Sequence, residues 1–241
     1  MKEENDDTVD ISNNHDDTVD ISNNYDNISN NSNCNDDNNT DDINIDIFNI
    51  RSRNNKNELP EHQIFVLDDV LDISLCDELI EVIEKYAVKK DKWRNGNNVM
   101  CHPINLEQLP RELYIKYDKI LYEVINKIIN FLHHNFDITA KGDCGYSLRK
   151  IYGPTRFHKD GIVVDNKHEH LMSVHKIRCM SLIIALNDDY DEGEFCFPAQ
   201  RHKVKLKKGN AIAFPPYWTH EHGVTCPKNG FRYTINTWLY E

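Results

Sequence analysis

The stretch Phe157-His-Lys-Asp-Gly161 lies at the centre of the region that decides the fold of this 241-residue chain. Residues two apart on a β-strand point to the same face of a sheet, so His158 and Asp160 can bind one metal ion from one side. His222 follows 62 residues after Asp160. Two histidines and one carboxylate, with open coordination positions beside them, are typical of non-haem Fe(II) sites. The sequence therefore predicts a metal site formed by His158, Asp160 and His222.

Arg232, ten residues after His222, adds a second element to this pattern. An iron enzyme that uses a 2-oxo diacid needs a fixed cation for the far carboxylate of that co-substrate. Arginine supplies a charged, two-pronged donor for this purpose. A His-x-Asp triplet alone is weak evidence, because His15-Asp-Asp17 is a second one. Only the triplet at His158 is followed by strand-like segments that end in a histidine and then an arginine.

Short segments rich in β-branched and aromatic residues, separated by Gly, Pro and Asn, fill the chain after residue 145. The strands expected there are 146–151, 157–164, 179–186, 194–197, 203–206, 210–214 and 231–239. An opening strand is expected at 63–67. Helices followed by many antiparallel strands predict an α+β fold, in which N-terminal helices buttress one face of a jelly roll.

Two helices are expected before these strands. Ser74 with Asp77 three residues later resembles a capping box, and apolar residues follow at helical spacing. A second helix is expected over 111–134, with one apolar stripe that includes Tyr117 and Ile128. Both stripes are predicted to be core.

The N-terminal segment differs from the rest in composition. The first 50 residues carry 14 acidic side chains and one lysine, a net charge of −13, so the remainder is near +1 in a chain of −12. The nine residues from Asp6 to Asn14 recur unchanged from Asp16 to Asn24. We expect 1–57 to be a disordered, acidic, Asn/Asp-rich tail and 58–241 to be the folded domain. The tail is either a low-complexity expansion without function or an acidic interaction segment.

Cysteine content and hydropathy predict the cellular location of the protein. The N-terminus is acidic and lacks an apolar core, and no apolar run approaches the length of a membrane span. The seven cysteines include no Cys-x-x-Cys pair, which argues against a disulfide framework and a zinc ribbon. The expectation is a soluble, intracellular, cytoplasmic protein with reduced thiols.

The order of four stretches resembles the 2-oxoglutarate/Fe(II)-dependent dioxygenase superfamily, and within it the prolyl 4-hydroxylase branch. These stretches are 64–80, 157–161, 178–198 and 208–238, and the resemblance spans about 60–241. The family fold is a double-stranded β-helix, or jelly roll. The resemblance implies that His158, Asp160 and His222 are the iron ligands and that Arg232 binds the co-substrate.

Three further positions follow from the same resemblance. Thr234 shares a strand face with Arg232 and is a possible hydroxyl donor to the same carboxylate. Tyr152 stands where the family uses a tyrosine hydroxyl against the co-substrate. Ala185 replaces a second tyrosine, so the chain departs here from the prolyl 4-hydroxylase pattern.

The second histidine ligand has two candidates, His220 and His222. Strand alternation cannot choose between them, because both have the same parity. The family histidine precedes its basic residue by nine to ten positions, which favours His222 with Arg232. The other histidine would then support the site or face the substrate.

The implied activity is hydroxylation of a C–H bond with release of succinate and CO2. The implied cofactors are Fe(II), 2-oxoglutarate and O2, with ascorbate as an expected reductant. The implied partner is a peptide or protein substrate that contains proline. One alternative is the same chemistry on a nucleic acid base or a small metabolite, although the near-neutral domain lacks a basic stripe. Another is a non-catalytic, metal-binding β-roll that interacts with a partner protein. The sequence does not predict the oligomeric state.

Overall fold

The computed structural model describes residues 51–52, 60, 62–89, 100–161 and 177–241. Most of the expected tail, 1–57, therefore lies outside the described residues. Arg51 and Ser52 are an exception, because they form strand β1 and pair with strand β2. At these two residues the chain departs from the disorder expected up to residue 57, because their backbone groups bond to a sheet edge.

Two antiparallel sheets form the body of the domain. The large sheet has the order β1-β2-β11-β7-β14-β5-β3, with β4 beside β14. Its strands are β1 (Arg51–Ser52), β2 (Phe65–Asp68), β3 (Cys101–Asn105), β4 (Gly142–Asp143), β5 (Ser147–Ile151), β7 (Arg178–Ala185), β11 (Ala211–Phe214) and β14 (Arg232–Tyr240). The small sheet has the order β10-β9-β12-β6. Its strands are β6 (Thr155–His158), β9 (Phe195–Phe197), β10 (His202–Val204) and β12 (His222–Val224). A separate pair consists of β8 (Asp191–Glu192) and β13 (Pro227–Lys228).

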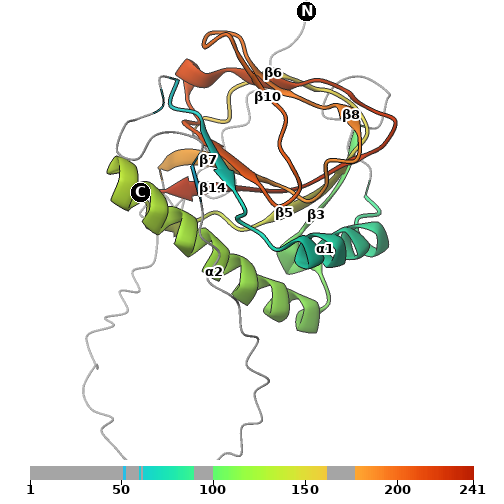
Figure 1. Cartoon of the computed structure of the whole chain (residues 1–241). Helices are drawn as coiled ribbons and strands as arrows, with labels where there is room; N and C mark the ends of the chain where they lie inside the picture. The colour runs from blue at the N-terminus through green and yellow to red at the C-terminus, as the bar shows by residue number, and fades with distance from the viewer. Residues whose placement is uncertain (1–50, 53–59, 61, 90–99, 162–176) are drawn as a thin grey trace, which may run out of the picture. The chain divides into compact units, whose positions relative to one another are not determined.

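Helices cover one side of this arrangement. Helices α1 (Ile73–Tyr86) and α2 (Arg111–Phe136) lie against the large sheet, and the small sheet lies on the opposite side (Figure 1). Short 3₁₀ turns occupy Leu106–Gln108 and Trp218–His220. The fold is a double-stranded β-helix with buttressing N-terminal helices, so the predicted fold class is confirmed. Neither helix is long and apolar enough to cross a membrane, within the part of the chain that the structure describes.

The long strands agree with the sequence prediction to within about two residues, but β3 was not predicted. Its sequence, Cys-His-Pro-Ile-Asn, contains Pro103, which has no N–H to donate to a sheet. Strand β3 pairs only with β5, at the edge of the large sheet, where a proline is tolerated. Strand β6 ends at His158, earlier than the predicted 157–164, and the rest of that prediction beyond 161 lies outside the described residues.

The start of α1 corrects a detail of the sequence analysis. The capping residue is Asp72, not Ser74, because the Asp72 carboxylate accepts hydrogen bonds from the backbone N–H groups of Ser74 (2.7 Å) and Leu75 (3.4 Å). A carboxylate at the N-cap satisfies N–H groups that have no partner within the helix. Helix α2 runs two residues beyond the predicted 134, to Phe136, and is capped by Asp137, which adopts a left-handed conformation (φ 54°).

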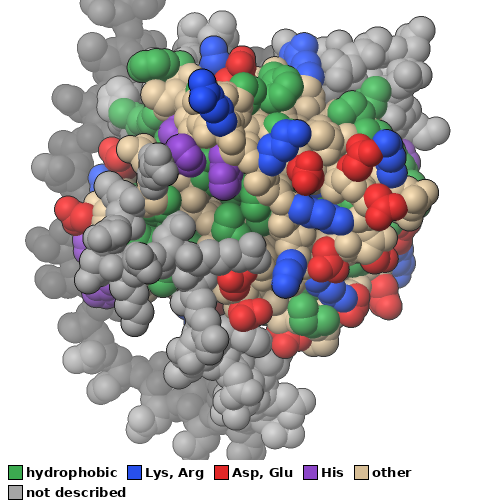
Figure 2. Space-filling view, turned by 45° about the horizontal axis from the view of Figure 1, so that its top comes forward, with side chains coloured by type: hydrophobic (Ala, Val, Ile, Leu, Met, Phe, Trp, Pro, Cys, Tyr) green, Lys and Arg blue, Asp and Glu red, His purple; other side chains and the backbone are tan. Residues whose placement is uncertain are grey.

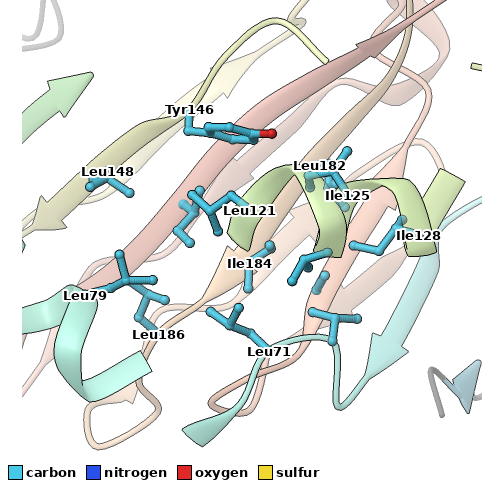
Figure 3. Close-up of a cluster of buried hydrophobic side chains, with 14 of the residues drawn as sticks. Leu71, Leu79, Leu121, Ile125, Ile128, Tyr146, Leu148, Leu182, Ile184 and Leu186 are labelled. Carbon is cyan, nitrogen blue, oxygen red and sulfur yellow. The ribbon is translucent and has the colours of Figure 1, made fainter. Parts of the chain in front are cut away.

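The alternation of side chains on β7 separates two apolar clusters. Leu182, Ile184 and Leu186 face the helices and pack with α2 residues such as Ile125 (Figure 3). Ile183 and Ala185 face the space between the sheets and pack in a second cluster. Strand β7 thus joins the helical layer to the interior of the roll.

A polar network ties α1 to the strand that carries Arg232. Glu84 of α1 accepts a hydrogen bond from the Tyr233 hydroxyl and pairs with the Lys150 ammonium at 2.7 Å. Burial would raise the pKa of Glu84, but the hydrogen bonds from Lys150 and Tyr233 outweigh burial and lower it. Tyr233 packs in the helix-side cluster, so its neighbour Arg232 faces the interior of the roll.

We expect Ile184→Ala to lower the free energy of unfolding by about 2–5 kcal/mol, because it removes a fully packed side chain. Ile183→Ala is the matched control. Ile183 borders the interior pocket, so its loss enlarges a space that is already open, and a smaller destabilisation is expected. Urea denaturation of both variants measures the difference. Equal losses would contradict the assignment of the main core to the helix side of β7.

Candidate metal centre

Strand β6 ends at the first predicted ligand. His158 is its last residue, and Asp160 lies two residues later, in the turn that leaves the strand. The backbone N–H of Gly161 donates to the Pro216 carbonyl at 2.6 Å, and Gly161 has a left-handed conformation (φ 57°). The turn brings the Asp160 carboxylate back to His158, with Oδ1 3.2 Å from Nε2. The two residues meet as predicted, although through a turn and not through one continuous strand.

The second histidine comes from the neighbouring strand of the small sheet. Strands β12 and β6 are antiparallel, and their register places His222 directly opposite His158. The centroids of the two imidazole rings are 4.3 Å apart, and His222 Nε2 is 3.9 Å from Asp160 Oδ2. One ligand atom from each of the three residues lies within 4.8 Å of the others. Among the described residues, these three form the one such group of His, Cys, Asp and Glu.

Backbone carbonyls fix the orientation of both imidazoles. His158 Nδ1–H donates to the Arg156 carbonyl at 2.9 Å, and His222 Nδ1–H donates to the His220 carbonyl at 3.0 Å. Because a carbonyl can only accept, each ring has a proton on Nδ1 and turns its Nε2 toward the shared space. Hydrogen bonds of this kind orient histidine ligands in metal sites.

Ser181 supports the carboxylate from the large sheet. Its hydroxyl donates to Asp160 Oδ2 at 2.5 Å, and the serine is buried on β7. Sequence reasoning missed this residue. The signal was a single hydroxyl within an otherwise apolar strand, since buried polar groups require a partner.

The environment keeps the carboxylate charged. Burial would raise the pKa of Asp160, but hydrogen bonds from His158 and Ser181 and the nearby His222 lower it. For His222 the largest effect is burial, which lowers its pKa. For His158 burial lowers the pKa, but the Asp160 carboxylate and the Arg156 carbonyl together outweigh burial and raise it. An ionised carboxylate between two imidazoles is a site suited to a cation.

The structure places His220 away from this group. Its Nε2–H donates to the His62 carbonyl at 2.9 Å, and its Nδ1 contacts the Thr219 hydroxyl at 2.9 Å. The side chain is only 3% exposed. His220 therefore contributes its backbone carbonyl to His222 and not its ring to the metal centre.

A pocket that is open to solvent connects the three ligands with Arg232 and Thr234. Arg232 is 4% exposed, and its Nε and Nη1 atoms have no hydrogen-bond partner among the described residues. Burial is the main cause that lowers the pKa of Arg232 to about 10, which leaves the guanidinium charged at neutral pH. A buried charge without a partner is costly, so this arginine is suited to an anionic ligand.

The structure places the other two predicted co-substrate residues differently from each other. Tyr152 does not line the pocket, because Ile151, the last residue of β5, occupies the inward position and the next residue points elsewhere. The Tyr152 hydroxyl instead bonds to His102 Nδ1 at 2.7 Å. Thr234 does line the pocket, and its hydroxyl donates to Asn236 Oδ1 at 2.7 Å.

Comparisons with known proteins agree with this geometry. Residues 151–240 match the sequence pattern of the family described as 2OG-Fe(II) oxygenase superfamily. The matched range contains the three candidate ligands and Arg232. The resemblance to the 2-oxoglutarate/Fe(II)-dependent dioxygenases is thereby confirmed. No curated protein matches the chain in sequence.

Solved structures with a similar fold include several prolyl hydroxylases. A viral collagen prolyl hydroxylase from Paramecium bursaria Chlorella virus-1, in complex with 2OG, has 21% identity and a TM-score of 0.53, covering 73% of this chain and 94% of that one. A Trichoplax adhaerens prolyl hydroxylase in complex with a hypoxia inducible factor peptide fragment has 15% identity and a TM-score of 0.56, covering 76% and 86%. A Pseudomonas putida prolyl-4-hydroxylase has 14% identity and a TM-score of 0.54, covering 75% and 94%. The chain thus resembles these prolyl hydroxylases in fold.

We expect His158→Ala, Asp160→Ala and His222→Ala each to weaken Fe(II) binding more than about a hundredfold, which exceeds the usual effect of losing a residue that only supports a ligand. Anaerobic titration with Fe(II), followed by calorimetry, measures the affinity. His220→Gln is the control, because it keeps the backbone carbonyl that His222 uses. Retained affinity in His222→Ala with loss in His220→Gln would reverse the choice of histidine.

From the Ser181 contact we predict a smaller loss of Fe(II) affinity than from loss of a ligand. Ser181→Ala removes the hydrogen bond that orients the Asp160 carboxylate, so Fe(II) affinity should fall by about tenfold to a hundredfold. The fold should persist, because alanine fits a site that holds serine. The same titration, with thermal unfolding alongside, checks both statements; an unchanged affinity would remove Ser181 from the site.

Proposed function

We propose that this protein is a 2-oxoglutarate- and Fe(II)-dependent dioxygenase that hydroxylates a prolyl residue of a peptide or protein. The observation that carries the proposal is a single pocket with two kinds of group. One is a set of two imidazoles and a carboxylate whose ligand atoms converge. The other is a buried arginine with unpartnered nitrogen atoms.

The donor set suits Fe(II), and His158, Asp160 and His222 would hold it. Two nitrogen ligands and one oxygen ligand leave positions open for further ligands. Bound Fe(II), with 2-oxoglutarate and O2, would supply the oxidant that hydroxylates a C–H bond, with succinate and CO2 as products. The chain supplies orientation, through the carbonyls of Arg156 and His220 and the hydroxyl of Ser181.

The co-substrate would bind along β14. Arg232 offers two nitrogen donors to the far carboxylate of 2-oxoglutarate, which is bidentate recognition of an anion. Thr234 is the next inward residue on the same strand, and its hydroxyl oxygen lies beside that position. Phe195 packs its ring 5.3 Å from the Arg232 guanidinium and helps to exclude water from the pair. Ascorbate, as a reductant, is part of the proposal and belongs in the assay.

The prolyl substrate rests on the structural relatives, because prolyl hydroxylases recur among them. Nucleic acid as the substrate has less support. On the face in Figure 2, outside the grey atoms, Lys and Arg side chains are intermixed with Asp and Glu and form no basic stripe. A non-catalytic metal-binding role gives no reason for a buried, unpartnered Arg232 in the pocket.

Arg232→Ala should raise the 2-oxoglutarate concentration for half-maximal succinate formation by one to three orders of magnitude. This corresponds to about 2–5 kcal/mol for a broken buried charge pair, at about 1.4 kcal/mol per decade. Arg232→Lys should recover part of the loss, because lysine keeps the positive charge but lacks the two parallel N–H donors of the guanidinium. Succinate formation from 2-oxoglutarate, with ascorbate and proline-containing peptides, is the measurement.

Fe(II) affinity is the internal control, since Arg232 is not a ligand. It should change little in both variants. An unchanged half-saturation concentration in Arg232→Ala would remove the arginine from the site and count against the proposed function.

A further inference from the structure

The pocket has a second cationic residue, Arg149 on β5. In the register of β5 with β14, Arg149 lies opposite Thr234, and the next inward pair along the strands is Ile151 with Arg232. Arg149, Thr234 and Arg232 all line the pocket. Two guanidinium groups therefore approach one cavity from neighbouring strands.

A hydrogen bond holds the Arg149 side chain beside Ser147. Its Nε donates to the Ser147 hydroxyl at 3.1 Å. Ser147 lies opposite Asn236, on the side of Arg149 that is farther from Arg232. The Nε side of Arg149 is thus held toward the Asn236 end of the pocket, whereas Arg232 lies at the other end. The charge of Arg149 still reaches Arg232 and helps to lower its pKa.

Trp238 contributes a further donor at this end. It is the next inward residue of β14 after Asn236 and lines the pocket. Its Nε1 atom is buried and has no hydrogen-bond partner among the described residues. The Arg178 guanidinium stacks on its ring, 4.0 Å from the centroid. Because an indole N–H can only donate, this atom is available to an acceptor atom of a ligand.

The polar groups at this end of the pocket are mainly hydrogen-bond donors. Arg149 and Trp238 are donors only, and Asn236 uses its oxygen for Thr234, which leaves its amide nitrogen as a donor. Asp160 is the only carboxylate among the described residues that line the pocket, and it accepts from Ser181 and faces the two histidines. A set of convergent donors beside a cation selects an anion with several acceptor atoms.

We propose that Arg149, Asn236 and Trp238 bind a carboxylate of the primary substrate, at the end of the pocket opposite to the co-substrate's Arg232. The proposal rests on the proposed function, because it assigns the Arg232 end to 2-oxoglutarate. The carboxylate has two possible sources. It is the side chain of an acidic residue next to the target proline in a peptide, or the α-carboxylate of a terminal or free amino acid.

Binding of matched probes separates these sources. The full chain is loaded anaerobically with Fe(II) and 2-oxoglutarate, and calorimetry measures the affinity of blocked pentapeptides with Asp, Asn or Lys beside a central proline. A peptide that ends in proline is compared with its C-terminal amide. A carboxylate bound by this end should improve affinity about tenfold to a hundredfold over its neutral counterpart, the usual range for a charge-assisted hydrogen bond.

Substitutions at Arg149 test the residue itself. Arg149→Gln should abolish the preference for the carboxylate, and Arg149→Lys should keep part of it. Arg149→Glu should shift the preference to the Lys peptide, a reversal that a purely structural role would not produce. Arg111→Gln is the control, because it removes the same charge from an exposed position at the start of α2. Thermal unfolding checks that each variant is folded.

The outcomes also separate this proposal from the proposed function. No preference for any carboxylate probe in the unaltered protein, or a preference that survives in Arg149→Gln, overturns the carboxylate site. An increase in the half-saturation concentration for 2-oxoglutarate in Arg149→Gln, without a change in peptide preference, would assign Arg149 to the co-substrate instead. Absence of 2-oxoglutarate-dependent succinate formation with every probe would count against the proposed function, whereas the binding preference does not depend on turnover.

Discussion

The pairing of β12 with β6 is the constraint on which the site depends. It places His222 opposite His158, and two backbone carbonyls then hold both rings with Nε2 toward the same space. A shift of one residue in this register would turn one histidine to the other face of the sheet. The buried His220 and its bond to the His62 carbonyl hold the turn before β12, so they help to fix the register.

The large sheet contributes to the same site through one strand with two roles. Residues of β7 that face the helices belong to the main core, whereas Ser181 and Ile183 face the metal centre and the pocket. Rigid packing on one face therefore positions polar groups on the other, as functional sites on strands require. Strand β14 has the same two faces. Tyr233 faces the helices and bonds to Glu84 of α1, whereas Arg232 faces the pocket.

Sequence reasoning reached the fold class, and it grouped the two histidines and the carboxylate that the structure places together, because the spacing and order of the motifs can be read from the sequence. It failed where tertiary contacts decide. Strand β3 was not predicted, because it contains Pro103 and lies at a sheet edge. Ser74 was predicted to cap α1, but Asp72 is the capping residue. Tyr152 was assigned to the pocket, but the end of β5 gives that place to Ile151. The roles of Arg149 and Ser181 could not be predicted. They depend on which face of each strand becomes the interior of the roll, and no short sequence motif indicates this.

The long separation in sequence between paired strands has a kinetic consequence. His158 and His222 meet only after β6 and β12 pair across 64 residues, and Ser181 joins them from a third strand. Contacts between distant residues form slowly, because a long loop must close before they stabilise the chain. Partly folded chains would therefore lack the assembled ligand set. A metal ion that binds only the native state favours that state by mass action, so under the proposed function iron supply would raise the fraction of folded chains.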